Sequence, residues 1–148
     1  EETKITLTGN PELRFIAAKA TGHNAEKIAS QTVIDYLTKH YPYLMKSSTA
    51  LYLCKDGHSC VSGVRVHREL HTIDDKHIMR IATDQRHYLV LESRVMGDYD
   101  RYADMLVTFA QDNGMTVDLQ GIFAVYQAKE SFDHLSIKMY CPVKIDTK

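Results

Sequence analysis

Two segments of this chain repeat apolar residues at helical spacing, while most of the rest alternates between apolar and polar positions. The segment Ala25–His40 carries apolar side chains on one helical face and is followed by Pro42, which predicts a helix that ends before the proline. A second helix is predicted at Asp100–Asn113, and Gly114 then stands where a C-terminal capping glycine belongs.

Strand-like segments surround both predicted helices. The chain starts with a short one that places Ile5 and Leu7 on the same face. The further strands predicted from alternation and turn residues are Leu13–Ala20, Thr49–Lys55, Val61–Glu69, His87–Met96, Ile122–Lys129 and Leu135–Val143. Each half of the chain therefore has the order strand, helix, strand, strand, and the fold class predicted is α+β.

The two halves also match at nearly constant offsets, which predicts an internal duplication. Residues 20–24 lie over 95–99 at a spacing of 75, Ala50-Leu51-Tyr52 over Ala124-Val125-Tyr126 at 74, and residues 64–67 over 137–140 at 73. Loop insertions produce a drift of this kind. We expect one domain over residues 1–148, with a first repeat at about 1–75 and a second at about 76–148.

A single strand-helix-strand-strand unit leaves one apolar sheet face bare, so two units are expected to pair about a pseudo-two-fold axis with a central groove. Grooves between half-domains are preferred ligand pockets. The aromatic residues expected to contact a ligand there are Tyr52, Tyr88, Phe123, Tyr126 and Tyr140. The alternative interpretation is that each tyrosine is a core residue whose hydroxyl reaches water.

Composition narrows the function classes. The chain has 148 residues, 44% hydrophobic and 25% charged, with a formal net charge of -1, so no field attracts a polyanion and no direct contact with nucleic acid is expected. No apolar run is long enough to span a bilayer, and no signal peptide is visible. Three irregularly spaced cysteines favour a reducing, cytoplasmic setting.

The second half carries motifs of a known family. Gly97-Asp98-Tyr99 after an apolar strand, Gly121-Ile122-Phe123-Ala124-Val125-Tyr126, and the closing strand that ends Tyr140-Cys141-Pro142-Val143 resemble those of gyrase-inhibitor-like (GyrI-like) effector-binding domains of MerR- and AraC-type multidrug regulators. The resemblance implies a duplicated α+β fold and recognition of lipophilic, aromatic and often cationic compounds. One residue departs from the pattern: Ala124 stands where the family has a groove glutamate, and Glu92 is our candidate substitute.

Catalysis and metal binding have less support in the sequence. Nucleophile motifs and phosphate-binding glycine loops are absent, and His67, His71 and His77 lack the paired spacing of zinc sites, so we expect no metal, no cofactor and no catalytic residue. The resemblance leaves two alternatives open, a hydrolase of reactive small molecules on the same fold or a stand-alone protein that binds a partner such as gyrase. A fused or separate transcription regulator would be the partner of a sensing domain.

Overall fold

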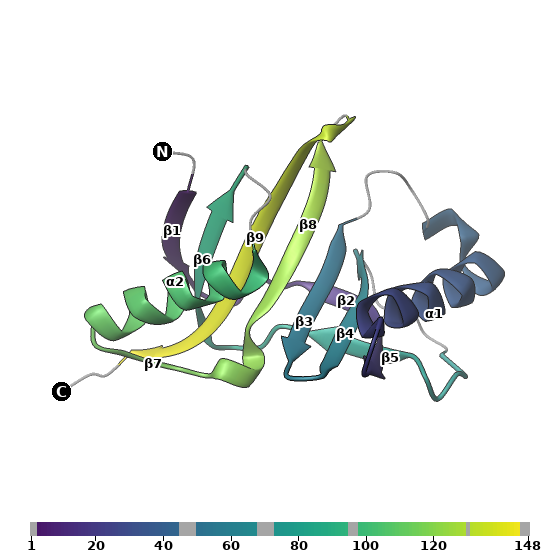
Figure 1. Cartoon of the computed structure of the whole chain (residues 1–148), viewed down its shortest axis with the longest axis horizontal. Helices are drawn as coiled ribbons and strands as arrows, with labels where there is room; N and C mark the ends of the chain where they lie inside the picture. The colour runs from purple at the N-terminus through teal and green to yellow at the C-terminus, as the bar shows by residue number, and fades with distance from the viewer. Residues whose placement is uncertain (1–2, 45–49, 68–72, 95–97, 130, 146–148) are drawn as a thin grey trace. The chain divides into compact units, whose positions relative to one another are not determined.

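The computed structural model describes residues 3–44, 50–67, 73–94, 98–129 and 131–145, and the chain divides into two units (Figure 1). The continuous unit is Glu12–Ala82. The discontinuous unit combines Glu1–Pro11 with Thr83–Lys148. The N-terminal segment therefore belongs with the second half of the chain, whereas the repeats expected from sequence divided the chain at about residue 75.

The continuous unit is an antiparallel sheet with one helix on it. Its elements are β2 (Arg14–Thr21), α1 (Ala25–His40), the 3-10 turn η1 (Pro42–Leu44), β3 (Leu51–Asp56), β4 (Ser59–Val66) and β5 (Met79–Ala82). The strands lie in the order β3-β4-β2-β5. The core forms where Val33, Tyr36 and Leu37 of α1 meet Ile16 of β2 and Val64 of β4.

The discontinuous unit repeats this plan. Its elements are β1 (Thr3–Thr8), β6 (His87–Ser93), α2 (Tyr99–Asp112), β7 (Met115–Val117), the 3-10 turn η2 (Leu119–Gly121), β8 (Phe123–Lys129) and β9 (Ser131–Ile145). The strand order is β1-β6-β9-β8, and β7 pairs with the end of β9. Figure 1 shows α2 crossing β6 and β9 on the viewer's side.

The strand expected around Ile5 and Leu7 is confirmed as β1, but the pairing of the edge strands was not predicted. β1 directly precedes β2 in the chain, yet it pairs with β6, and β5 directly precedes β6, yet it pairs with β2. Both units contain strand, helix, strand, strand and one edge strand, the discontinuous unit having β7 in addition, and the α+β class is confirmed. The internal duplication itself remains a prediction, and the Val95-Met96-Gly97 part of its first match lies outside the described residues.

Apolar spacing and helix-end residues in the sequence predicted the positions of both helices. The predicted helix Ala25–His40 is confirmed residue for residue, and the second begins and ends one residue earlier than expected, at Tyr99 and Asp112. Asp98 caps it, because its side chain accepts a hydrogen bond from the Asp100 backbone N–H. Gly114 adopts φ +70°, the left-handed conformation that suits glycine after a helix.

Gly63 on β4 allows a close approach of the β2 backbone. A Cβ atom at this position would lie 2.0 Å from the Ile16 carbonyl oxygen and 2.6 Å from the Ala17 Cα. The absent side chain also leaves room for aromatic packing, since Tyr52 stands opposite Gly63 and its ring centroid lies 4.6 Å from that of Phe15. Only glycine fits this position without moving the backbone.

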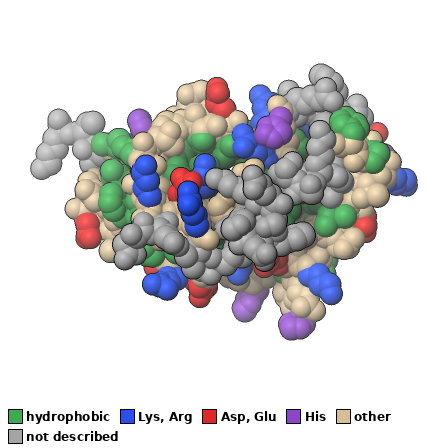
Figure 2. Space-filling view, turned by 90° about the horizontal axis from the view of Figure 1, so that it is seen from above, with side chains coloured by type: hydrophobic (Ala, Val, Ile, Leu, Met, Phe, Trp, Pro, Cys, Tyr) green, Lys and Arg blue, Asp and Glu red, His purple; other side chains and the backbone are tan. Residues whose placement is uncertain are grey.

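Surface charge is mixed. On the face seen in Figure 2, acidic and basic side chains of the described residues are interspersed. Neither helix in the described ranges is long and apolar enough to cross a membrane.

Candidate ligand-binding site

Each helix covers only part of its own sheet. α2 packs on β6, β7 and β9, and α1 packs on β2 and β4. β8 ends the strand order of the discontinuous unit and β3 begins that of the continuous unit, and each has a helix-side face that its own helix leaves largely uncovered. On these faces Tyr126 is half-buried and Leu51 exposed, whereas Ala124 and Leu53 are buried. We describe each face within its own unit.

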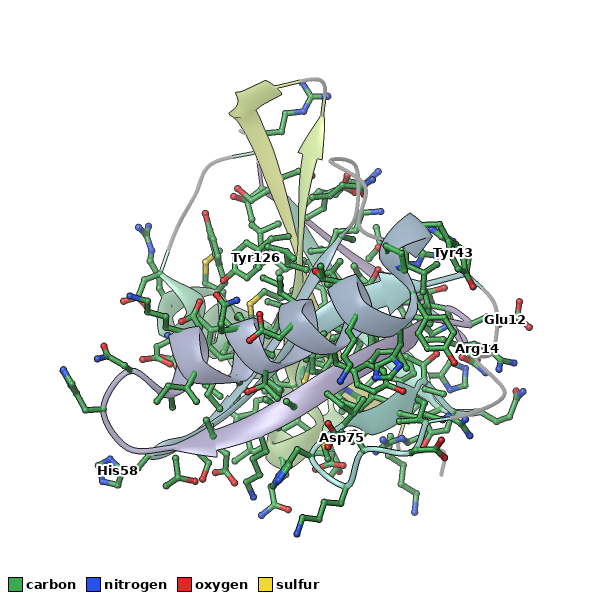
Figure 3. The ribbon with its side chains drawn as sticks, turned by 90° about the vertical axis from the view of Figure 1, so that its right-hand side faces the viewer. Glu12, Arg14, Tyr43, His58, Asp75 and Tyr126 are labelled. Carbon is green, nitrogen blue, oxygen red and sulfur yellow. The ribbon has the colours of Figure 1, made fainter. Side chains whose placement is uncertain are left out.

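Tyr126, labelled in Figure 3, is carried by β8. Its register partner on β9 is Ile137, and Ile137 in turn stands opposite Ser93 on β6. Ser93 faces α2, because its hydroxyl lies 3.2 Å from the Tyr102 hydroxyl on that helix. Side chains of directly opposed residues share a face of the sheet, so Tyr126 projects to the α2 side. It is half-buried, so part of its side chain is accessible.

Ala124 shares this face, because it lies two residues before Tyr126 on the same strand. It stands opposite Met139 and is fully buried. A glutamate at this position, as in the family pattern, would be carried on the same face as Tyr126. The described neighbours on this face of β9 are Ile137, Met139 and Cys141, so no carboxylate replaces the missing one there.

Leu51 is the corresponding open residue of the continuous unit. It stands opposite Val64, a member of the core beneath α1, yet its own side chain is 51% exposed. The contact expected from the sequence on this strand was its neighbour Tyr52 instead. The alternation of the strand places Leu51 and Tyr52 on opposite faces of the sheet, so a shift of one residue decides which of the two lies on the α1 side.

Tyr52 lies on the face of its sheet away from α1. It stands opposite Gly63, is only 5% exposed and packs against Phe15. Tyr52 and Tyr126 are therefore not equivalent in the structure, although the 74-residue offset paired them. Ligand contact by Tyr52 remains a prediction, and a ligand would first have to displace the Phe15 contact.

Four predicted residues share the face of the discontinuous unit away from α2. The register sets Tyr88 opposite Pro142, Glu92 opposite Lys138, and Phe123 opposite Tyr140. Phe123 and Tyr140 stack with their ring centroids 4.9 Å apart and their planes 12° from parallel. Tyr88, Phe123 and Tyr140 are buried, so the structure uses them as packing residues; ligand contact by them remains a prediction.

Glu92 is exposed and stands between two lysines, opposite Lys4 on β1 and Lys138 on β9. Its strand face is the one opposite to that of Tyr126. The suggestion that Glu92 supplies the carboxylate missing at Ala124 therefore meets a geometric obstacle, because the sheet itself separates Glu92 from Ala124 and Tyr126. The two lysines also compete with any cationic ligand for this carboxylate.

The Tyr88 hydroxyl serves a local polar network. It donates to Asp84 Oδ1 at 2.8 Å, and Arg86 links Asp84 to Asp118 through contacts of 2.7 and 2.8 Å. Hydrogen bonds from Arg86 and Tyr88 lower the pKa of Asp84, and burial raises the pKa of Tyr88. The network fixes the turn before β6 to the turn before β8, and it leaves the Tyr88 hydroxyl already engaged.

Nucleophilic thiols are disfavoured in the described chain. Cys60 and Cys141 are buried, and desolvation raises the pKa of each thiol to about 11. Burial also raises the pKa of Cys54. Since the thiolate is the reactive form, all three thiols are poor nucleophiles at neutral pH.

Comparisons with known proteins show which solved structures share this fold. The sequence matches no protein-family model and no curated protein. The crystal structure of the EcmrR C-terminal domain has a TM-score of 0.72, with 13% identity over 97% of this chain and 99% of that chain. The chain has the fold of that domain. The resemblance to gyrase-inhibitor-like effector-binding domains is thus confirmed at the level of the fold.

Two further structures share the fold. A cryo-EM structure of an EcmrR–DNA complex, EcmrR-RPo, gives a TM-score of 0.68 at 14% identity, and the match covers 97% of this chain and 58% of EcmrR. A hydrolase from Listeria innocua gives a TM-score of 0.57 at 11% identity, with 97% of this chain and 93% of the hydrolase covered.

Proposed function

We propose that this chain is an effector-binding domain that reversibly binds a small lipophilic, aromatic molecule at the helix-side face of β8, in the discontinuous unit. The observation that carries the proposal is the half-buried Tyr126 on β8, a strand that α2 leaves largely uncovered. The likeness of the fold to the EcmrR C-terminal domain supports this assignment.

The chemistry of the β8 face favours an uncharged ligand. The ring of Tyr126 offers a flat apolar surface to an aromatic ligand. Ala124, Ile137 and Met139 on the same face are apolar, and an organic cation without a carboxylate partner costs free energy when it leaves water. We therefore propose neutral aromatic molecules as the preferred class, with cationic ones weaker.

Ligand binding can act as a signal when a second protein or domain responds to the bound state. EcmrR was solved in complex with DNA, and this chain corresponds to 58% of that protein. We propose that ligand binding here is reported to a transcription regulator, either fused to this domain or separate. A gyrase-type protein partner is the alternative readout.

The test uses two probes of similar shape and different charge, triphenylphosphine oxide and the methyltriphenylphosphonium cation. A probe at 100 times its dissociation constant adds about 2.7 kcal/mol to the free energy of unfolding, which a thermal-shift measurement detects. We expect stabilisation by the neutral probe, and a weaker effect of the cation. Tyr126→Ala should reduce the shift.

Matched variants control for general loss of apolar surface. Tyr43→Ala and Leu119→Ala remove side chains that are 51% and 65% exposed away from the proposed contacts, and they should leave the probe shift unchanged. Equal loss in the control variants, or no stabilisation by either probe, would refute the proposed site.

The fold likeness to a Listeria hydrolase makes hydrolysis the second candidate. General acid-base catalysis needs a titratable group within hydrogen-bond reach of the substrate. On the β8 face Tyr126 is the titratable side chain among Ala124, Tyr126, Ile137 and Met139, without an acidic partner in that set. Turnover of an activated ester that Tyr126→Phe abolishes would favour the hydrolase over the binding domain.

A further inference from the structure

A groove runs between α2 and the edge strand β1, both in the discontinuous unit, and it shares no residue with the proposed ligand site. Its volume is about 670 Å³. The residues that line it are Ile5, Asp98, Asp100, Arg101, Asp104, Met105, Thr108, Phe109 and Asp112. We call it the α2 groove.

The floor of the α2 groove is apolar. Ile5 stands opposite Leu91, which is fully buried on the α2 side of the sheet, so Ile5 projects toward α2. Met105 and Phe109 lie one helical turn apart, and Phe109 is 37% exposed. Leu7 continues the apolar row of β1 and is 45% exposed. Accessible large apolar side chains clustered on one surface mark interaction sites more often than isolated ones do.

The rim of the groove is acidic, with four aspartates against one arginine. Asp98 and Asp100 lie at the N-terminus of α2, where carboxylates stabilise a helix, and Asp98 is its cap. Asp104 and Asp112 lie beyond that first turn. Asp104 has a like charge four residues before it, at Asp100, and an opposite charge three residues before it, at Arg101, so these pair effects largely cancel. Asp112 ends the helix, where the macrodipole disfavours a carboxylate.

Among the residues that the structure describes, neither carboxylate has an ion-pair partner. The ion pairs described in the discontinuous unit are those of Arg86 with Asp84 and Asp118. Helix stability therefore does not account for Asp104 and Asp112. A surface that costs stability and combines an apolar floor with an acidic rim is complementary to a partner with the opposite pattern.

We propose that the α2 groove is a docking surface for a basic amphipathic helix of a partner protein. From Asp100 to Asp112 the groove spans about 18 Å along the helix axis, which corresponds to more than three helical turns of a partner. An apolar stripe on that helix would lie on Ile5, Met105 and Phe109. Lysine and arginine side chains flanking the stripe would reach Asp104 and Asp112, as in helix-in-groove recognition.

The acidic rim also decides against a nucleic acid as the occupant, because four aspartates repel a phosphate backbone. A small organic cation would fill only one part of an elongated groove and would gain from one or two carboxylates. The length and the repeated charge thus favour a polypeptide helix.

The experiment measures binding of a fluorescein-labelled synthetic helix of about 18 residues with leucine on one face and lysine on the others. Fluorescence anisotropy at about 50 mM and about 300 mM NaCl gives the dissociation constant and its salt dependence. The double variant Asp104→Asn/Asp112→Asn should weaken binding about 3- to 10-fold at low salt. Phe109→Ala should weaken it at both salt concentrations, since that contact is apolar.

Controls separate docking from general attraction of a basic peptide to an acidic surface. Asp35→Asn/Asp56→Asn removes the same charge from exposed positions of the continuous unit and should leave the dissociation constant unchanged. A peptide of the same composition with its leucines scattered should bind at least about tenfold more weakly. Equal loss in both double variants, or equal binding of both peptides, would overturn the proposal.

Stability gives an independent readout that does not depend on the probe. Because Asp112 opposes the helix macrodipole and the pair effects at Asp104 largely cancel, Asp104→Asn/Asp112→Asn should keep or raise the melting temperature while it weakens peptide binding. A marked fall of the melting temperature in this variant would show that the two carboxylates stabilise the fold, and the docking proposal would fail.

Discussion

The Glu92 and Tyr126 side chains lie on opposite faces of one sheet, because Glu92 stands opposite Lys138 on β9 whereas Tyr126 stands opposite the adjacent Ile137. Successive residues of a strand point to opposite faces. Glu92 therefore cannot share a face with Tyr126. The face of Tyr126 is left without the carboxylate that the family pattern places at Ala124.

Removal of the Glu92 carboxylate should therefore not change ligand charge preference. We expect Glu92→Gln to bind triphenylphosphine oxide and methyltriphenylphosphonium within about twofold of the unaltered chain, whereas Tyr126→Ala should lose about tenfold for the better probe. Isothermal titration calorimetry measures both. A loss confined to the cation in Glu92→Gln would show that Glu92 contacts the ligand after all.

The backbone contact at Gly63 predicts a severe stability effect. Gly63→Ala places a Cβ 2.0 Å from the Ile16 carbonyl oxygen, so β2 and β4 must separate or the strand must shift. We expect a loss of about 3 kcal/mol or more in the free energy of unfolding, measured by urea denaturation. Gly9→Ala is the control, since a Cβ there meets no atom within 4 Å and should cost less than about 0.5 kcal/mol.

The buried hydrogen bond between Ser93 and Tyr102 joins β6 to α2. The two hydroxyl oxygens are 3.2 Å apart, and the residues are 0% and 6% exposed. A double-mutant cycle of Ser93→Ala and Tyr102→Phe should give a coupling of about 0.5–1.5 kcal/mol in the free energy of unfolding. A coupling near zero would mean that packing alone holds α2 against β6.

Asp84 predicts a small dependence of stability on pH. Hydrogen bonds from Arg86 and Tyr88 lower its pKa in the folded state. A lowered folded pKa contributes stability above the unfolded value of about 3.9, and this contribution is lost as the pH falls through the folded pKa. Asp84 is 56% exposed, so water screens the interaction and we expect less than about 1 kcal/mol.

The measurement compares Asp84→Asn with the unaltered chain in urea unfolding at about pH 7 and about pH 3. The variant should be less stable at the higher pH, and the difference between the two proteins should shrink at the lower pH. Asp56→Asn controls for the loss of one carboxylate elsewhere on the surface. A difference that grows on acidification would contradict the direction of the shift.

The sequence by itself determined the local elements of this protein. The helix Ala25–His40 follows from apolar residues at helical spacing and from Pro42, and both signals act within a few residues of the backbone that they shape. The central strands were found with shifted ends for the same reason. The short strands β5 and β7 were missed because segments of four and three residues carry too little alternation to detect.

Only the tertiary structure decided which strands pair and which face each side chain occupies. β1 joins β6 across some 80 residues of sequence, and no local preference encodes that choice. Tyr52 and Tyr126 match in sequence yet lie on different faces relative to their helices, because register is fixed by the packing of a whole sheet against its helix and one residue of shift reverses every side chain. The apolar composition of the β8 face could be foreseen, whereas the half-buried position of Tyr126 depends on where α2 stops covering its sheet.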